Sequence, residues 1–279
     1  MMKRFSPRAK TLLLAFLLLA LFFLYGGLFY PHPAGLPSGG SLEAPSFAHW
    51  LGTDDLGVDL YAQLSAGFFS SMAVGLAAAA FAFLLGGLAV GVLAGLSSGA
   101  ADALFSFLIQ LFLSLPQLPV MVVIGAFFGQ SAWNIILIVS LFSWAPIAKV
   151  LRARVRQIRG RPYLRLAESY GGRAGYLVSA HMLGELLPLL SVSALSVVGK
   201  AIVQEASLAY LGLSDPLSRS WGLLIQKCVS FPGIYFTPYW KWWLLPPVFA
   251  LVLTVLCLRL FSRELETIWR REESDAAGA

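Results

Sequence analysis

Two ionisable side chains inside a long apolar run are the groups best placed to do chemistry in this sequence. Lys200 and Glu205 interrupt the apolar residues 186–211. Charged groups are costly inside a membrane and therefore tend to face protein or water. The two residues are five positions apart, which is about 140° around a helix with 3.6 residues per turn, so they do not face each other. Glu205 is either a residue of a transport path or gate, or a hydrogen-bonding partner of another helix, and Lys200 can also reach the membrane interface.

Two glutamines, Gln117 and Gln204, are the other polar candidates for a transport path. Gln117 lies between Pro116 and Pro119 in the apolar residues 103–128. Proline kinks a helix and leaves a carbonyl group without its usual partner. A membrane tolerates such a carbonyl only where neighbouring protein or water satisfies it. The sequence leaves open whether this kink lines a path or only serves packing.

Three acidic residues, Asp54, Asp55 and Asp59, stand close together before the second apolar run. They invite a calcium interpretation, but they lack the alternating order and the distant glutamate of an EF-hand loop. We therefore predict that Thr53 or Asp54 is a helix N-cap. A contact between these acids and an external protein is the alternative.

The histidines and the missing nucleotide motifs limit the chemistry further. His32, His49 and His181 are far apart in the sequence and lack the spacing of metal ligands, so we predict no metal site. The sequence has no GxxxxGK[ST] loop and no Ser or Cys with a convincing base partner. We therefore expect no catalytic residue and no cofactor on this chain, and any ATP and Mg²⁺ to bind another polypeptide.

The composition indicates a membrane protein. The chain has 279 residues, of which 58% are hydrophobic and 12% are charged, whereas a soluble domain carries about 25% charged residues. The net charge of +6 comes with no basic face and no alternation of basic and aromatic residues, so we expect no nucleic-acid partner. Cys228 and Cys257 do not form the framework of a disulfide-rich protein.

Six apolar runs are long enough, or nearly so, to cross a membrane, which takes about 20 helical residues. They are residues 11–30, 67–96, 103–128, 132–150, 186–211 and 242–261. The first run exceeds the apolar region of a signal peptide, about 7–15 residues, so we expect a retained span. In the second, Gly87, Gly91 and Gly95 share a helix face suited to close helix packing. The predicted fold is an all-α integral membrane protein with six transmembrane helices.

Basic residues cluster before the first run, after the fourth and after the last. The clusters are Lys3, Arg4, Arg8 and Lys10; eight Lys and Arg residues between Lys149 and Arg173; and Arg259, Arg263, Arg270 and Arg271. Six spans place all three clusters on one side. Basic residues favour the cytoplasmic side, so we predict that both termini are cytoplasmic.

The basic loop after the fourth run, residues 151–185, predicts a protruding knob. Pro162 can begin a short helix, because the N–H that proline lacks would have no partner there. Gly171 and Gly172 can end this helix, since glycine accepts the left-handed backbone found at helix C-termini. A short helix and a glycine turn held between two spans would suit docking into another protein. An ordinary solvated loop is the alternative.

Four stretches resemble the binding-protein-dependent ABC importer permeases, specifically the C-type permease of the dipeptide, oligopeptide and nickel group. In the loop, Ala167, Gly171, Leu187 and Pro188 match the EAA signature of these permeases. LGTDDLGVDL at 51–60, QEASLAYLGL with SRSWGLLI within 204–225, and WWLLPPVFALVLTVL at 242–256 are similar to further motifs of that group. Together they cover most of the chain from Leu51 onward.

The sequence departs from this pattern at charged positions. Arg165 stands where the signature has its first glutamate, and Glu168, one turn away, is a possible replacement. Val58 replaces an arginine of the group, and Ala62 and Gln63 replace a frequent Ser-Arg pair. Coupling to an ATPase is therefore expected to use different charges.

The resemblance implies a type I ABC importer permease in the inner or plasma membrane of a bacterium or archaeon, carrying peptides or nickel chelates. It implies a heterodimer with a homologous B-type permease, two ABC ATPase subunits, an external solute-binding protein and surrounding membrane lipid. The residues implied for ATPase coupling are Arg165, Ala167, Glu168, Gly171, Gly172 and Pro188. The alternative is an ATP-independent channel or scaffold whose basic loop binds anionic lipid.

On this basis the chain divides into four parts. Residues 1–30 form the N-terminal tail and first helix, and 31–66 an external linker. Residues 67–262 form a five-helix permease core that contains the loop 151–185, and residues 263–279 form a cytoplasmic tail.

Overall fold

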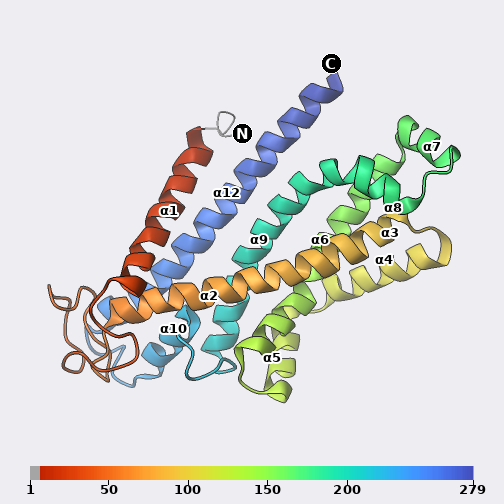
Figure 1. The fold of residues 1–279 in the computed structure, drawn as a ribbon. Helices are drawn as coiled ribbons and strands as arrows, with labels where there is room; N and C mark the ends of the chain where they lie inside the picture. Colours follow the sequence, from red (N-terminus) through yellow and green to blue (C-terminus); the bar gives the residue numbers. More distant parts are fainter. Residues whose placement is uncertain (1–6, 279) are drawn as a thin grey trace.

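The computed structural model describes residues 7–278 and is all helical in its regular structure (Figure 1). The helices in chain order are α1 (Pro7–Leu28), α2 (Leu60–Ala82), α3 (Val92–Leu96), α4 (Gly99–Ser114), α5 (Gln117–Phe128), α6 (Ala132–Arg159), α7 (Pro162–Ser169), α8 (Ala174–Leu177), α9 (Leu183–Tyr210), α10 (Trp221–Ser230), α11 (Trp240–Trp243) and α12 (Leu245–Gly278). Two π-helical segments, Phe83–Gly91 and Val178–Met182, join α2 to α3 and α8 to α9.

The described helices contain five or six candidate membrane spans, in agreement with an all-α membrane protein. Five are long and apolar enough to cross a membrane: Pro7–Leu28, Leu60–Leu96, Ala132–Arg159, Gly175–Tyr210 and Trp240–Trp269. The pair α4 and α5 passes the same test only when taken together. The prediction of six spans therefore holds if this pair counts as one.

The third predicted span is not one kinked helix but two helices. α4 and α5 meet at an angle of 88°. Leu115, the residue before Pro116, has φ −68° and ψ 137°, which is extended backbone. The ring of a following proline disfavours helical backbone at the preceding residue. The proline thus breaks the span rather than bending it.

The second span begins at Leu60, earlier than the predicted Gly67, and its N-cap is neither Thr53 nor Asp54. Asp59 Oδ1 accepts a hydrogen bond from the Ala62 N–H at 2.9 Å. Asp54 Oδ1 instead accepts from the Leu56 and Val58 N–H groups, at 2.9 Å each, and so stabilises the preceding turn. The cap prediction was wrong because a neighbouring aspartate satisfies the helix.

The small residues of this span serve close packing, as predicted. A Cβ atom added at Gly91 would lie 2.8 Å from Leu151 Cβ, and one at Gly95 would lie 2.5 Å from Val155 Cβ. Both partners belong to α6. The glycine face therefore allows the backbone of this helix to approach α6 closely.

The helices form a bundle around α2, α6 and α9, which pack on one another, while α12 packs on α9 and α1 covers α2 and α12. The start of α1, the end of α12 and α7 lie at one end of the bundle, and residues 29–59 and α10 lie at the other (Figure 1). This arrangement agrees with the sidedness predicted from charge.

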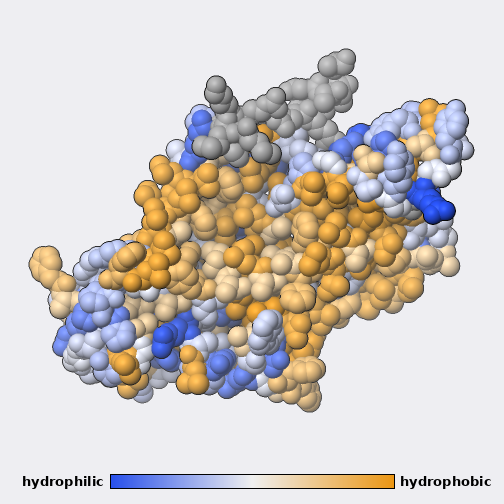
Figure 2. All heavy atoms as spheres, viewed as in Figure 1, coloured by the Kyte–Doolittle hydropathy of each residue, from blue (hydrophilic) through white to orange (hydrophobic). Residues whose placement is uncertain are grey.

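Exposed apolar side chains lie between these two ends of the bundle. Leu14, Leu18 and Leu21 of α1 are exposed. On the face seen in Figure 2, apolar residues form a broad band, and hydrophilic residues gather around the α7 loop and the opposite end. Such a band is what a hydrocarbon environment requires.

Candidate functional site

The loop between α6 and α9 folds into a knob whose centre is α7. The short helix predicted between Pro162 and Gly171 is present as Pro162–Ser169, and Pro162 is its first residue. Gly171 has φ +87°, and the Gly172 N–H donates to the Ala167 carbonyl at 2.9 Å. A glycine in the left-handed conformation together with this hydrogen bond is a common helix end, because the bond satisfies a carbonyl group that would otherwise have no partner at the C-terminus.

The knob presents apolar and aromatic side chains to solvent. Tyr163, Leu166, Tyr170 and Tyr176 are exposed, with Tyr170 89% exposed. Leu164 points the other way and is buried in the core. Aromatic and apolar groups on a protruding helix are typical of a surface that another protein covers.

The predicted coupling residues do not all lie on this exposed surface. Arg165 is exposed, whereas Ala167 is half-buried and packs against the core. The side chain of Glu168 lies outside the described part of the structure. Pro188 lies within α9, away from the tip of the knob.

Glu185, which the sequence analysis missed, fixes the base of the knob. Its carboxylate accepts hydrogen bonds from Arg161, from Arg154 Nη2 at 3.3 Å and from Tyr163 OH at 3.4 Å. These donors come from α6, from the link to α7 and from α7 itself. One carboxylate at the start of α9 therefore joins the knob to two long helices. The surplus of arginines in the loop was the available signal, since a buried or half-buried cluster of cations needs an acid.

Arg165 lines a basic cleft beside the knob. The cleft has a volume of about 400 Å³ and is lined by Gly95, Ser97, Arg156, Arg159, Gly160 and Arg165. Asp102 of α4 forms ion pairs with Arg152, at 2.6 Å, and with Arg156, which holds α4 against α6 next to the cleft. Replacing the expected glutamate by Arg165 thus adds a third guanidinium group to this surface.

The four predicted pathway residues separate into three places. The Gln204 Nε2 group donates to Gln117 Oε1 at 3.1 Å, which joins the start of α5 to α9. Lys200 is exposed and lines a cleft of about 430 Å³ between α6, α9 and α12. Glu205 is 1% exposed and lies apart from both.

Glu205 makes an interhelical hydrogen bond, the second of the two interpretations left open by the sequence. Ser71 of α2 donates to Glu205 Oε2 at 3.1 Å. The same Ser71 Oγ accepts from the Trp221 N–H at 3.4 Å. Glu205 thus connects α9 through α2 to the first residue of α10.

Of the three acids predicted to meet an external protein, only Asp55 has an exposed side chain. Asp54 is buried, and its Oδ2 accepts from Gln63 Nε2 at 2.7 Å. Asp59 is fully buried. Partial desolvation also raises the pKa of the Asp55 carboxyl above its usual range. Asp54 and Asp59 serve the folding of the linker.

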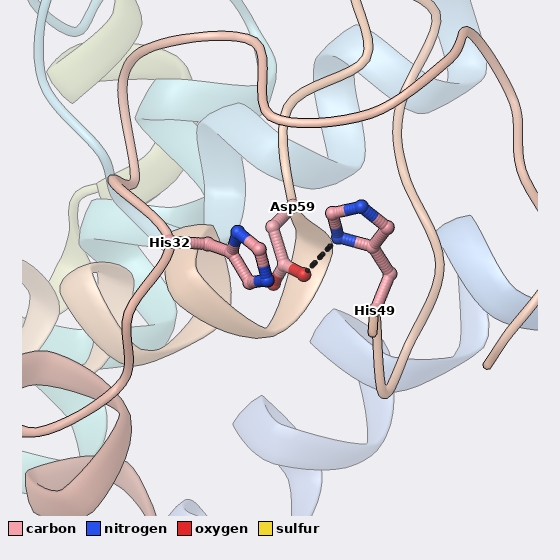
Figure 3. Close-up of side chains that lie close together, drawn as sticks. All are labelled: His32, His49 and Asp59. Carbon is pink, nitrogen blue, oxygen red and sulfur yellow. Dashed lines mark hydrogen bonds and ion pairs between the residues drawn. The ribbon is translucent and has the colours of Figure 1, made fainter. Parts of the chain in front are cut away.

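We expected no metal ligand among the three histidines because they are far apart in the sequence, but the structure brings two of them together. His32, His49 and Asp59 each place one possible ligand atom within 4.8 Å of the others (Figure 3). His181 lies elsewhere, with its ring 5.4 Å from that of Tyr176. Sequence distance does not reveal this proximity, because the linker folds back on the start of α2.

Fold and site together define the class of protein: a helical membrane protein with a protruding knob at α7 and a polar contact between α9 and the start of α5, where the span formed by α4 and α5 is broken. Comparison with known proteins gives the family. Residues 87–268 match the family described as "Binding-protein-dependent transport system inner membrane component". The chain belongs to this family, which is one of transport components rather than enzymes.

Similar proteins agree with this assignment. The chain is 31% identical over 217 residues to the "Putative peptide permease protein" of Brucella suis biovar 1, covering 77% of this chain and 70% of that protein. A protein of the same description from Brucella ovis matches equally well in identity and coverage. The chain is also 29% identical over 258 residues to the "Probable D,D-dipeptide transport system permease protein" of Escherichia coli K12, covering 92% of this chain and 85% of that protein.

Membership of the family has two consequences. The chain is an inner membrane component. A binding-protein-dependent transporter also implies an ATPase and a binding protein as partners.

Proposed function

We propose that this permease subunit imports peptides, forms its translocation path with a second, homologous permease, and belongs to a complex with two ATPase subunits, one of which docks on the α7 knob and moves it. The names of its relatives support peptides over nickel chelates as the solute. The observation that carries the docking proposal is the knob itself, an exposed aromatic helix anchored by Glu185 to the base of α9.

The structure offers a direct route from the knob to the other end of the bundle. The helical residues Gly175–Tyr210 form one candidate span of 36 residues. Glu185 lies near its cytoplasmic start, and Gln204 and Glu205 lie near its far end. A displacement of the knob would therefore shift two hydrogen bonds, the one that Gln204 donates to Gln117 and the one that Ser71 donates to Glu205.

Gln117 and Gln204 are our candidates for the polar lining of the path. They meet where the span formed by α4 and α5 is broken. Irregular backbone at membrane depth is tolerated where it faces protein or a water-filled cavity. A broken span beside two amide side chains supports a path at this junction, with Lys200 lining the approach from the cytoplasmic side.

The energy for transport would come from the partners. Binding of ATP favours one state of the ATPases, and the permease follows only as far as its two conformations differ in their contacts with them. Ala167, Gly171 and Gly172 shape the docking helix, while Pro188 shapes the helix to which it is attached. The basic cleft at Arg165 would accept an acidic side chain of the ATPase, with Glu168 as a second charge on the knob.

The docking proposal is tested by exchanging Gly171 for Trp. Gly171 has φ +87°, and no heavy atom lies within 4 Å of the place that a Cβ would take, so the substitution strains the turn and adds bulk at the docking surface. The matched control is Gly212→Trp, because Gly212 has φ +78°, equally open surroundings and a position at the other end of α9. We expect Gly171→Trp to lower ATPase co-purification and peptide uptake at least tenfold, and Gly212→Trp to preserve co-purification. Equal retention of the ATPases by both variants would contradict docking on α7.

The solute is tested separately by identifying what the external binding protein retains. The binding protein is purified without refolding and its ligand is released and analysed by mass spectrometry. Peptides support the proposal, whereas a nickel chelate would overturn it while leaving the docking argument intact.

A further inference from the structure

At the external end of the bundle, two imidazoles and one carboxylate from three separate segments converge. His32 follows α1, His49 lies in the middle of the linker, and Asp59 caps α2 (Figure 3). One possible ligand atom from each lies within 4.8 Å of the other two. None of these side chains takes part in the proposed docking or transport path.

We propose that His32, His49 and Asp59 bind one divalent transition-metal ion of the zinc type, which fastens the external linker to the start of α2. Imidazole nitrogen and carboxylate oxygen are ligands that zinc accepts. Three protein ligands with a fourth position open to water or a nearby group form a complete zinc coordination shell.

Asp59 is already oriented as a one-oxygen ligand. Its Oδ1 is occupied by the Ala62 N–H of α2, at 2.9 Å. Its Oδ2 faces His49 Nδ1 at 2.7 Å. Ligand carboxylates are commonly oriented by hydrogen bonds of their own. The helix cap therefore aims the other oxygen at the two rings.

The two rings are held close to this oxygen. The His32 and His49 ring centroids are 4.6 Å apart, and His32 Nε2 lies 3.0 Å from the Ala48 carbonyl oxygen. Gly39 lies directly against His49, since a Cβ there would be 2.6 Å from His49 Nε2. The backbone of the linker thus restrains both imidazoles.

Tyr30 and Glu43 complete the surroundings. Tyr30 OH donates to Asp59 Oδ2 at 3.1 Å and so helps to hold the carboxylate in place. Glu43 Oε2 lies 4.0 Å from His49 Nε2 and is about half exposed. Glu43 thus lies on the other edge of the His49 ring from Asp59 and adds negative charge there.

The site is buried on one side and accessible on the other. His49 is 4% exposed and Asp59 is fully buried, whereas His32 is half-buried. A metal ion would enter past His32. Two ligands of a tetrahedral zinc ion with bonds of about 2.0–2.1 Å are about 3.3 Å apart. The separation of His49 Nδ1 from Asp59 Oδ2, now 2.7 Å, must therefore widen slightly when the ion lies between them.

The test is zinc binding by the purified transporter complex carrying a tag without histidine. The chain has only three histidines, which supplies a matched control. We expect one zinc ion per chain, measured by competition with a chromophoric chelator and by metal analysis after gel filtration. His32→Ala is expected to weaken binding at least tenfold, and His181→Ala to leave it unchanged. X-ray absorption at the zinc edge is expected to show two imidazole ligands, one of them lost in His32→Ala.

Asp59→Asn provides a second variant that keeps the helix cap, because asparagine is also a good N-cap. It is expected to weaken zinc binding while the complex still assembles. Wild-type protein that binds no more zinc than His32→Ala would overturn the proposal, as would an equal loss in His181→Ala. The measurement requires neither transport nor ATP, so its outcome is independent of the proposed function.

Discussion

The α7 knob and the external linker are both irregular regions between long helices, yet they are built in opposite ways. The knob exposes Leu166 and Tyr170 and is fixed at its base by one carboxylate, Glu185. The linker buries two aspartates whose oxygens are occupied by backbone and side-chain donors. The α7 knob is therefore suited to bind a partner and to move with it, whereas the linker is suited to remain rigid.

Aromatic stacking strengthens this difference. In the linker and the adjoining helices, the Trp50 and Tyr61 ring centroids are 5.1 Å apart, and those of Tyr30 and Tyr61 are 4.8 Å apart. These contacts join the linker to α2. The tyrosines of the knob are instead exposed to solvent. Among the described residues of the knob, the ring contacts are those of His181 with Tyr163 and with Tyr176. Under the docking proposal, this exposed aromatic surface is the one that the ATPase would cover.

The largest effect is expected from Asp59→Ala in the linker. The variant loses the N-cap of α2, worth about 1 kcal/mol, and leaves the hydrogen-bonding groups of His49 and Tyr30 without their partner, which adds about 1–3 kcal/mol. We expect a markedly lower melting temperature of the purified complex by fluorescence-monitored unfolding. Asp55→Ala is the control, because this exposed neighbour should change stability by no more than about 0.5 kcal/mol. Similar melting curves for the two variants would contradict the rigid character of the linker.

Glu185→Ala is expected to have the next largest effect, at the base of the knob. It removes the common acceptor of Arg154, Arg161 and Tyr163, which we expect to cost about 2 kcal/mol because Arg154 is mostly buried. The expected readouts are faster proteolysis of the loop 151–185 and weaker ATPase co-purification. Asp215→Ala, at the external end, is the control. Unchanged proteolysis in Glu185→Ala would show that another contact anchors the knob.

Gly171→Ala is a milder test of the turn that ends α7. An alanine at φ +87° is strained by about 1 kcal/mol, but it adds little bulk. We expect a small loss of ATPase coupling, measured as peptide-stimulated ATP hydrolysis, with assembly preserved. Gly212→Ala carries a similar strain at φ +78° and should leave coupling intact; an identical response from both would argue against a special role for the α7 turn.

Leu166→Asp is expected to affect stability least, and it still tests whether the knob, unlike the external end, binds the ATPases. The side chain is 58% exposed, so the free energy of unfolding should remain within the range of surface substitutions, about 0.5 kcal/mol. Affinity for the ATPases should nevertheless fall, because a charge enters an apolar docking surface. Phe236→Asp, at a residue 90% exposed near the external end, is the matched control for added charge. Normal ATPase binding by Leu166→Asp would place the docking surface elsewhere.

The sequence predicted those features that depend on short-range rules. Hydropathy predicted the spans, charge predicted which ends lie together, and Pro162 and Gly171 predicted the limits of α7. The break between α4 and α5 was only partly predicted. Proline effects are local, but whether a helix bends or breaks depends on what the neighbouring helices, such as α6 and α9, can satisfy.

The sequence by itself determined that this is a helical membrane transport subunit, because apolar length, basic loops and motif order are properties of the chain in one dimension. Only the tertiary structure decided that His32 and His49 lie close to Asp59 and that Gln204 bonds to Gln117. It also decided that Glu185 accepts hydrogen bonds from Arg154 and Arg161. Each of these groups joins residues from different helices or loops. Such contacts are set by how helices pack and loops return, and no spacing along the chain encodes them directly.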